Sequence, residues 1–317
     1  MTAYLVPCGL SILDGLALSR CKPAESGDVE STLAGLVTWA TRKHRASPDA
    51  LADAWAQTYP KHAEALALRR WDHRVSAEIS TLHGRAPALD LHRDTVVLLS
   101  SATDDGVLAT LLVATRVARG DLARIHYAAT PQRLGAAGAY PMDGRGVLVV
   151  LVSGLSDEAP DGFDRAAQGI GDVMRAVRDS VPGPIEVHLA GGHKATLMYC
   201  LALAEVLRST VVDPSTVTAW YLFEERRRNH RAEEPSGNRT PVPAEIRLRR
   251  FPNEVLRPMA IELRRAEDKM PAYKRESPGY IFAEVGWESY GRGRRLNAFG
   301  HGFLALLRHL APPAGEG

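Results

Sequence analysis

A short strand, a pair of glycines and a helix follow one another in the second half of this 317-residue chain, and this junction constrains the fold more than any other stretch. Apolar residues alternate along 185–189, stop at Gly191 and Gly192, and resume as a run of helix formers over 195–207. Glycines accept backbone angles closed to other residues and leave nearby N–H groups uncovered, so the start of this helix can receive an anion. Lys194 adds a flexible cation there. A tight turn with a solvated lysine fits equally well, so this stretch alone leaves both interpretations open.

The same order of strand, turn and helix recurs along the chain. We expect strands at 3–7, 94–100, 124–129, 147–152, 185–189 and 217–223. The second of these is a continuous apolar run, typical of a strand buried on both faces of a parallel sheet. Alternating strands and helices with right-handed crossovers predict an α/β fold with a doubly wound, mostly parallel, Rossmann-like sheet. Helical periodicity from about 27 to 83 predicts a long helical insertion between the first two strands.

A turn-rich break at 233–241 divides the chain into a sheet domain, residues 1–240, and a small C-terminal domain or tail, residues 241–317. The tail carries a short basic strand at 292–295 and then an amphipathic helix. These elements fit the wing and last helix of a winged-helix unit, which would bind DNA or dimerise, and they also fit a plain packing appendage, which is slightly favoured. Because the motifs described below precede the break, we expect residues 251–317 to be largely dispensable for ligand binding.

Composition narrows the classes of protein that fit. An apolar fraction of 45% with 24% charged residues is ordinary for a folded globular protein and excludes disorder as the main state. The formal charge of +2 supplies no global field for nucleic acid, so any nucleotide has to be recognised by a local site. Basic clusters at 226–228 and 247–250 are candidate anion contacts.

The three cysteines, Cys8, Cys21 and Cys200, show neither a paired disulfide pattern nor the spacing of a metal site. That usage suits a reducing compartment, so we expect three buried thiols. The apolar start of the chain has no basic residue before it, and nowhere do 18 uncharged apolar residues follow one another. We therefore expect a cytoplasmic protein with no membrane partner, no metal and no cofactor.

Hydroxyl and carboxyl side chains follow the first two predicted strands. Ser11 comes after the first strand, and Ser101, Thr103 and Asp104 come after the second. Open α/β sheets bind ligands at the carboxyl ends of their strands. Taken singly, the same residues serve more often as helix N-caps, so capping is the favoured interpretation for each.

The order of these junctions resembles the CRISPR-associated Rossmann-fold (CARF) family, in particular its ring nucleases and its sensors of cyclic oligoadenylate in type III CRISPR defence. The most specific piece is 188–194, where His-Leu-Ala-Gly-Gly-His-Lys stands in the place of the family's strand ending Asn-x-Thr-Gly-Gly-x-Lys. The glycines and the lysine match, whereas His188 and Ala190 depart from the pattern. Other pieces, spread over residues 3–230, are Gly9-Leu10-Ser11-Ile12 for the family's Gly-Thr-Ser-Leu, Ser76-Ala77-Glu78 in a helix, the strand end at 100–106, and 220–224.

The resemblance implies a homodimer that sets the strand ends of two sheets around a two-fold axis and forms one pocket for a symmetric cyclic RNA, with cyclic tetra-adenylate favoured. It also implies that no metal is needed. Lys194 and Ser11 are the implied catalytic residues: Lys194 neutralises charge on the phosphorane, and Ser11 orients ribose or phosphate. The implied ligand-binding residues are Gly9, Leu10, Ser11, Ser101, Thr103, Asp104, Gly191, Gly192, His193 and Lys194.

Cleavage of a cyclic RNA requires only positioning and charge stabilisation from the protein. RNA carries its own nucleophile, the ribose 2′-hydroxyl, and holding it in line with the phosphorus and the departing 5′-oxygen yields a 2′,3′-cyclic phosphate without metal. The amides of Gly191 and Gly192 would donate to the phosphorane oxygens. The expected function is a metal-independent ring nuclease that switches type III CRISPR signalling off.

Two other functions remain open. One is a non-catalytic sensor of cyclic oligoadenylate that acts as a ligand-controlled DNA-binding regulator. Its tail would bind the DNA, with Arg292, Arg294 and Arg295 in contact with the DNA phosphates. The other is a HEPN-type RNase, because Arg295 and His301 have the spacing of that motif. Such spacing arises easily by chance among many arginines and eleven histidines, and HEPN domains are larger all-helical units than this tail. The absence of a long effector domain in this sequence favours the ring nuclease.

Overall fold

A seven-stranded sheet forms the centre of the protein in the computed structural model, with strand order β3-β4-β2-β1-β5-β6-β7. The first six strands are parallel, and β7 pairs antiparallel with β6. The strands are β1 (Ala3–Pro7), β2 (Thr95–Ser101), β3 (Ile125–Ala128), β4 (Gly146–Val152), β5 (Ile185–His188), β6 (Val217–Leu222) and β7 (Pro243–Ile246). The expected α/β class with a mostly parallel sheet is confirmed. The six predicted strands are present with ends within one residue of those expected, and β7 was not predicted.

The structure describes residues 1–12, 76–128, 130–131, 134, 146–155, 161–192, 194–222, 242–268, 287–290 and 293–310. Of the predicted helical insertion, only its end is described, where it enters helix α4 (Ala77–Arg85). The rest of that insertion, the predicted break at 233–241, His193 and Cys21 lie outside the described residues.

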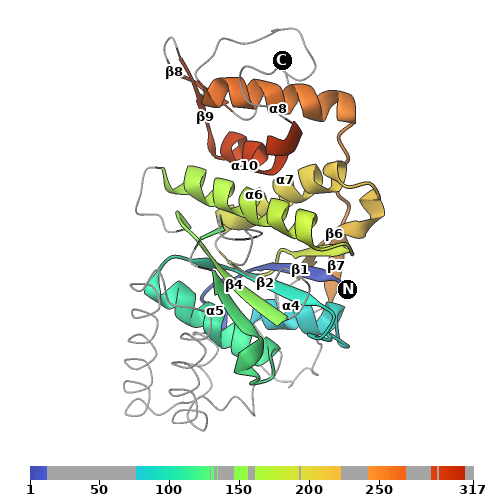
Figure 1. The fold of residues 1–317 in the computed structure, drawn as a ribbon. Helices are drawn as coiled ribbons and strands as arrows, with labels where there is room; N and C mark the ends of the chain where they lie inside the picture. Colours follow the sequence, from blue (N-terminus) through green and yellow to red (C-terminus); the bar gives the residue numbers. More distant parts are fainter. Residues whose placement is uncertain are drawn as a thin grey trace, which may run out of the picture.

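Helices cover both faces of the sheet (Figure 1). On one face, α4 and α5 (Asp104–Val117) pack against a cluster that includes Tyr4 and Val6 of β1. On the other face, α6 (Gly162–Ser180) and α7 (Lys194–Thr210) pack against a cluster that includes Ala3 and Leu5. Because both faces are covered, β1 and β4 are buried along their whole length, which explains their unbroken apolar runs.

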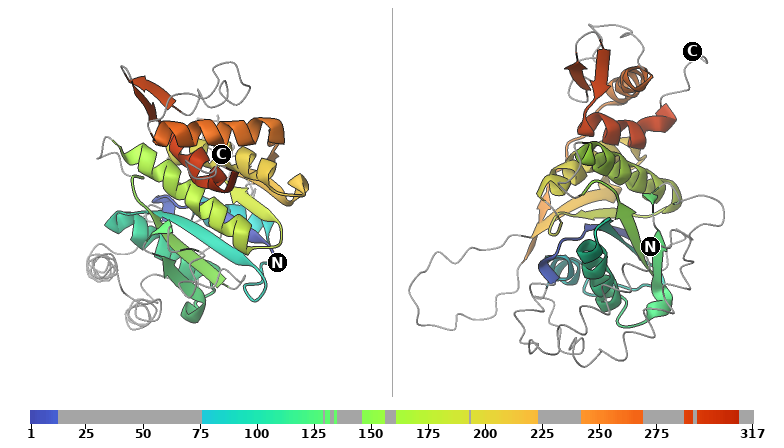
Figure 2. Two further views of the ribbon diagram at one scale, coloured as in Figure 1. Left: turned by 45° about the horizontal axis from the view of Figure 1, so that its top comes forward. Right: turned by 90° about the vertical axis from the view of Figure 1, so that its left-hand side faces the viewer.

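The C-terminal segment forms a further layer on α6 and α7 (Figure 2). Its elements are α8 (Asn253–Glu267), β8 (Trp287–Tyr290), β9 (Gly293–Leu296) and α10 (Ala298–Leu307), and short 3-10 turns lie at Leu122–Arg124, Pro214–Thr216 and Arg308–Leu310. Helix α10 lies close to α6 because each helix has a glycine at the contact, Gly171 on α6 and Gly302 on α10. A Cβ atom on Gly171 would overlap the carbonyl oxygen of Gly302. Leu256 of α8 and Leu304 of α10 belong to the same buried cluster as α6 and α7, so the two predicted units share one core.

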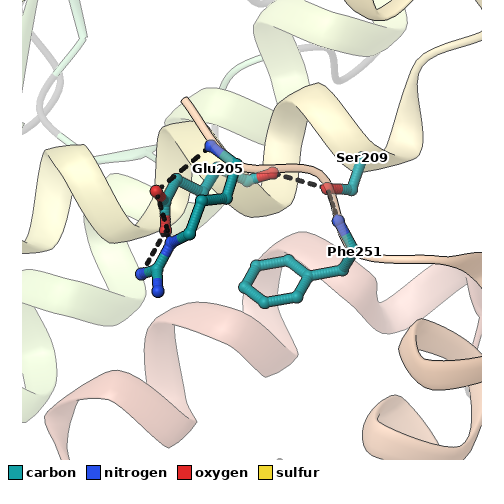
Figure 3. A network of polar contacts seen from close by, with 4 residues as sticks. Glu205, Ser209 and Phe251 are labelled. Atoms are coloured by element: carbon teal, nitrogen blue, oxygen red, sulfur yellow. Dashed lines mark hydrogen bonds and ion pairs between the residues drawn. The ribbon is translucent and has the colours of Figure 1, made fainter. Parts of the chain in front are cut away.

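Polar contacts fasten the start of this segment to α7 (Figure 3). Glu205 accepts hydrogen bonds from the backbone N–H of Arg249 at 3.2 Å and from its Nη2 at 2.8 Å. One turn further along α7, Ser209 Oγ accepts from the N–H of Phe251 at 2.8 Å. The chain leaving β7 is therefore held to α7 before α8 begins.

Candidate functional site

Three of the predicted site segments lie at one edge of the sheet. Strand β1 pairs with β2 on one side and β5 on the other, and all three are parallel, so their carboxyl ends point the same way. We call this edge, formed by residues 9–11, 101–104, 191–192 and 194, the carboxyl edge. Gly9 and the Gly191-Gly192 turn are in direct contact, since a Cβ atom on Gly9 would lie 2.9 Å from the backbone nitrogen of Gly192. The sheet thus unites residues that stand more than 180 positions apart in the chain.

The two glycines after β5 are required for different reasons. Gly192 has φ +91°, in the left-handed region that strains other residues. At Gly191 the constraint is space, because a Cβ atom there would overlap the carboxylate of Glu78. The turn is therefore shaped by the protein's own packing as well as by any ligand.

Glu78 is the residue on which the site converges, and sequence reasoning did not place it among the site residues. Its side chain is fully buried, and its carboxylate accepts three hydrogen bonds. The donors are the N–H of Gly9 at 2.8 Å, Ser11 Oγ at 3.0 Å and Ser76 Oγ at 2.5 Å. A buried carboxylate without partners is very costly, and these donors take up its lone pairs where water is excluded. None of the ion pairs found between described residues includes Glu78.

The first turn of α4 presents this carboxylate. Ser76 is the N-cap, with extended backbone angles, and its Oγ accepts from the N–H of Ile79 at 3.2 Å. An acidic residue in the first turn is also favoured by the helix dipole. The Ser76-Ala77-Glu78 triplet, which the resemblance had marked, was the available signal for this residue. What the sequence does not reveal is that Glu78 faces two glycine turns from other parts of the chain.

Ser11 is exposed, and its hydroxyl donates to Glu78. The neighbouring Leu10 is 47% exposed at the same loop. Both implied ligand residues are thus open to solvent, whereas the N–H of Gly9 is already bonded to Glu78.

The polar residues at the end of β2 and directly after it surround a helix cap. Thr103 is the N-cap of α5, and its Oγ1 accepts from the N–H of Gly106 at 3.1 Å, so the capping prediction is confirmed for this residue. Ser101 Oγ lies 2.9 Å from Thr103 Oγ1. Asp104 begins α5, but its side chain lies outside the described part of the structure.

Of Lys194, one of the two implied catalytic residues, the structure describes only the backbone. Lys194 is the first residue of α7, so its backbone sits at the helix N-terminus beside the glycine turn. Its side chain is outside the described part of the structure. In the same turn of helix, Thr196 Oγ1 is buried and has no hydrogen-bond partner among the described atoms.

His188, one of the two departures from the family pattern, does not face the carboxyl edge. It is fully buried on the α4 face of the sheet, edge-on to Tyr4 with ring centroids 5.8 Å apart. Its Nε2 lies 3.7 Å from Glu186, which is itself paired with Arg85. Burial lowers the pKa of His188 below its usual value, although Glu186 opposes the shift. The side chain is a neutral part of the core at neutral pH.

The described thiols are core groups. Cys8 and Cys200 are buried and free, as expected, and burial raises the pKa of Cys200 to about 12. Burial, followed by the negative charge of Glu78, also raises the pKa of Cys8. Neither thiol is suited to act as a thiolate nucleophile.

The described part of the chain contains no group of three or more His, Cys, Asp or Glu side chains placed to hold a metal ion. Among its helices, none is both long and apolar enough to cross a membrane.

Comparison with known proteins adds no assignment. No protein-family model matches the chain, and no curated protein is significantly similar to it in sequence.

Proposed function

We propose that this protein is a CRISPR-associated ring nuclease that binds cyclic oligoadenylate, with cyclic tetra-adenylate favoured, at the carboxyl edge and cleaves it without a metal. The observation that carries the proposal is the meeting of the loop after β1 with the Gly191-Gly192 turn after β5. These are the two segments in which the resemblance to ring nucleases is most specific. They stand far apart in the sequence, and the fold brings them into contact.

The arrangement of the sheet supports a ligand at this place. The connections through α4 and α5 lie on one face and run toward β3, whereas those through α6 and α7 lie on the other face and run toward β6. We interpret this as a doubly wound sheet whose winding changes direction between β1 and β5. Open α/β sheets bind their ligands outside the strand ends at such a switch point.

The proposed reaction is an internal transfer within the RNA ring. The ribose 2′-hydroxyl loses its proton as its oxygen attacks the adjacent phosphorus, the bond from phosphorus to the 5′-oxygen breaks, and the 5′-oxygen takes up a proton, so that no proton is gained or lost overall. The products carry a 2′,3′-cyclic phosphate and a 5′-hydroxyl. The backbone N–H groups of the turn and Lys194 stabilise the phosphorane charge, and Ser11 holds the ribose.

The buried charge of Glu78 makes a cation at this edge more important. A phosphate that approaches Gly191 also approaches the Glu78 carboxylate, and like charges repel. The hydrogen bonds to Glu78 disperse part of its charge but do not cancel it. Lys194, at the start of α7, is the group that we expect to offset both anions.

A direct test is to incubate the purified protein with cyclic tri-, tetra- and hexa-adenylate in the presence of a chelator and to resolve the products by chromatography. Linear products ending in a 2′,3′-cyclic phosphate support the ring nuclease. Tight binding with no cleavage of any ring contradicts the enzyme and leaves the sensor interpretation. Neither binding nor cleavage of any ring rejects the ligand class.

A further inference from the structure

The hydrogen bonds around Glu78 determine what Ser11 can offer a ligand. An ionised carboxylate has no hydrogen to donate, so each of its three partners acts as the donor. The hydroxyl hydrogen of Ser11 is therefore directed to Glu78 Oε2, 3.0 Å away. Because the side chain of Ser11 is exposed, the lone pairs of its oxygen stay open to a ligand.

We expect Ser11 to keep donating its hydroxyl hydrogen to Glu78 when a ligand binds. Glu78 is fully buried, so water does not replace a donor that turns away. Leaving a buried charged acceptor with one donor fewer costs more than an exposed hydroxyl gains by donating elsewhere. Ser11 is thus held as an acceptor.

We propose that Glu78 is a positioning residue that keeps Ser11 as a hydrogen-bond acceptor, so that the site selects a ribose 2′-hydroxyl, which can donate, over groups that only accept. The inference rests on the proposed function and refines it. Phosphate oxygens are acceptors only, so they do not pair with Ser11 in this state. The sequence left ribose and phosphate both open for Ser11, and Glu78 favours ribose.

Glu78 also sets where Ser11 lies relative to the phosphate-binding turn. The same carboxylate binds the N–H of Gly9, two residues before Ser11, and fills the space next to Gly191. One buried group therefore fixes the spacing between the ribose contact and the turn. Such fixed spacing is what in-line attack by a 2′-oxygen requires.

The variant Glu78→Gln reverses the hydrogen bond to Ser11 with little change in size. Its amide oxygen has to face the N–H of Gly9, so its NH2 group faces Ser11 and Ser76 and donates to them. The hydroxyl hydrogen of Ser11 is then free to donate to the ligand. Ser11→Ala removes the group altogether, and Ser76→Ala is the matched control, because Ser76 also bonds to Glu78 but is buried away from any ligand.

The probes are cyclic tetra-adenylate and its 2′-fluoro counterpart, which keeps a similar sugar shape, accepts weakly and donates nothing. Binding of each probe is measured by competition at low temperature, with the titrated samples analysed for cleavage. We expect the natural protein and Ser76→Ala to bind the hydroxyl probe about tenfold more tightly than the fluoro probe, as the loss of a well-made hydrogen bond implies. In Glu78→Gln and in Ser11→Ala the preference is expected to fall to about twofold or less.

Thermal melting of each variant shows whether it is folded, and the ratio of the two affinities does not depend on the fraction of folded protein. If Glu78→Gln keeps the full tenfold preference, or if the natural protein shows none, the role of Glu78 is rejected while the proposed function stands. If the natural protein binds neither probe, the proposed function falls and this inference falls with it.

Discussion

Positions 191 and 192 both require glycine, but the backbone angle explains this requirement only at Gly192. Gly191 is explained by the carboxylate beside it, and that carboxylate belongs to a residue 113 positions earlier in the chain. The sequence left both glycines open as an anion site or as a plain tight turn, and the resemblance to ring nucleases implied the anion site. The structure adds that the protein itself fills the space around the first of them, so a side chain at this position is expected to disturb the core.

We expect Gly191→Ala to lower the free energy of unfolding by about 2 kcal/mol, because the new methyl group has to displace the buried Glu78 carboxylate. The control is Gly120→Ala, at a glycine with φ +82° and no atoms within 4 Å of the new methyl group, where strain alone costs about 1 kcal/mol. Urea denaturation measures both. A loss for Gly191→Ala no larger than that of the control would contradict the packing argument.

His188 makes stability depend on pH in a defined direction. Burial lowers its folded-state pKa below the ordinary value of 6.5, so the unfolded chain binds the proton more readily. Its contribution to stability is therefore full above pH 6.5 and is lost as the pH falls from there through the folded-state pKa. Glu186, 3.7 Å from His188, would stabilise the protonated ring and so offset part of the cost of burying its charge. The positive charge of Arg85 makes this offset smaller.

We expect His188→Asn to remove a measurable part of this acid destabilisation. The measurement is the free energy of unfolding at several pH values between 7.5 and 5 for the natural and variant proteins. His309→Asn is the comparison, since burial lowers that pKa too but the side chain is less enclosed. Parallel pH curves for His188→Asn and the natural protein would show that His188 does not titrate as argued.

At the scale of elements, strands were predictable and contacts between elements were not. The strands have continuous or alternating apolar residues bounded by turns, and these patterns are local, so their ends came out within one residue. Strand β7 was not predicted, although Ala244 and Ile246 flank the exposed Glu245 in an alternating pattern, because only four residues form the strand and it follows the turn-rich break. The cap formed by Thr103 was predictable for the same local reason. The meeting of Glu78 with Gly9 and Gly191 depends on three elements at once, and no periodicity reports it.

The C-terminal helices lead to an expectation that differs from the one drawn from the sequence. Because Leu256, Leu263 and Leu304 pack in one core with α6 and α7, removal of residues 251–317 uncovers a broad apolar face. We expect the shortened protein to lose its cooperative thermal transition, whereas removal of 311–317 alone should leave that transition in place. A shortened protein that melts like the full chain and still binds ligand would restore the view of a dispensable tail.

At the scale of the whole molecule, one carboxyl edge is a small site for a cyclic tetranucleotide. The described residues of one chain offer the Gly191-Gly192 turn and the starts of α5 and α7 there, whereas the ring carries four phosphates related by symmetry. A two-fold pair of edges supplies each contact twice. We therefore expect a homodimer by sedimentation equilibrium, with or without ligand. A monomer under both conditions would contradict the shared pocket.

Single-turnover cleavage of cyclic tetra-adenylate, in the presence of a chelator, by the natural protein and by Lys194→Ala is the sharpest test of the proposed mechanism. We expect linear products with a 2′,3′-cyclic phosphate and a loss of about a hundredfold or more in the cleavage rate of Lys194→Ala, as for other removed donors to a transition-state anion. Binding of the ring should fall far less, because the charge on Lys194 is needed most when the phosphorane forms. Ser11→Ala should be milder than Lys194→Ala, since a residue that orients the ribose does not carry the charge. Cleavage that depends on added metal, or a cleavage rate unchanged by Lys194→Ala, would contradict the proposed mechanism.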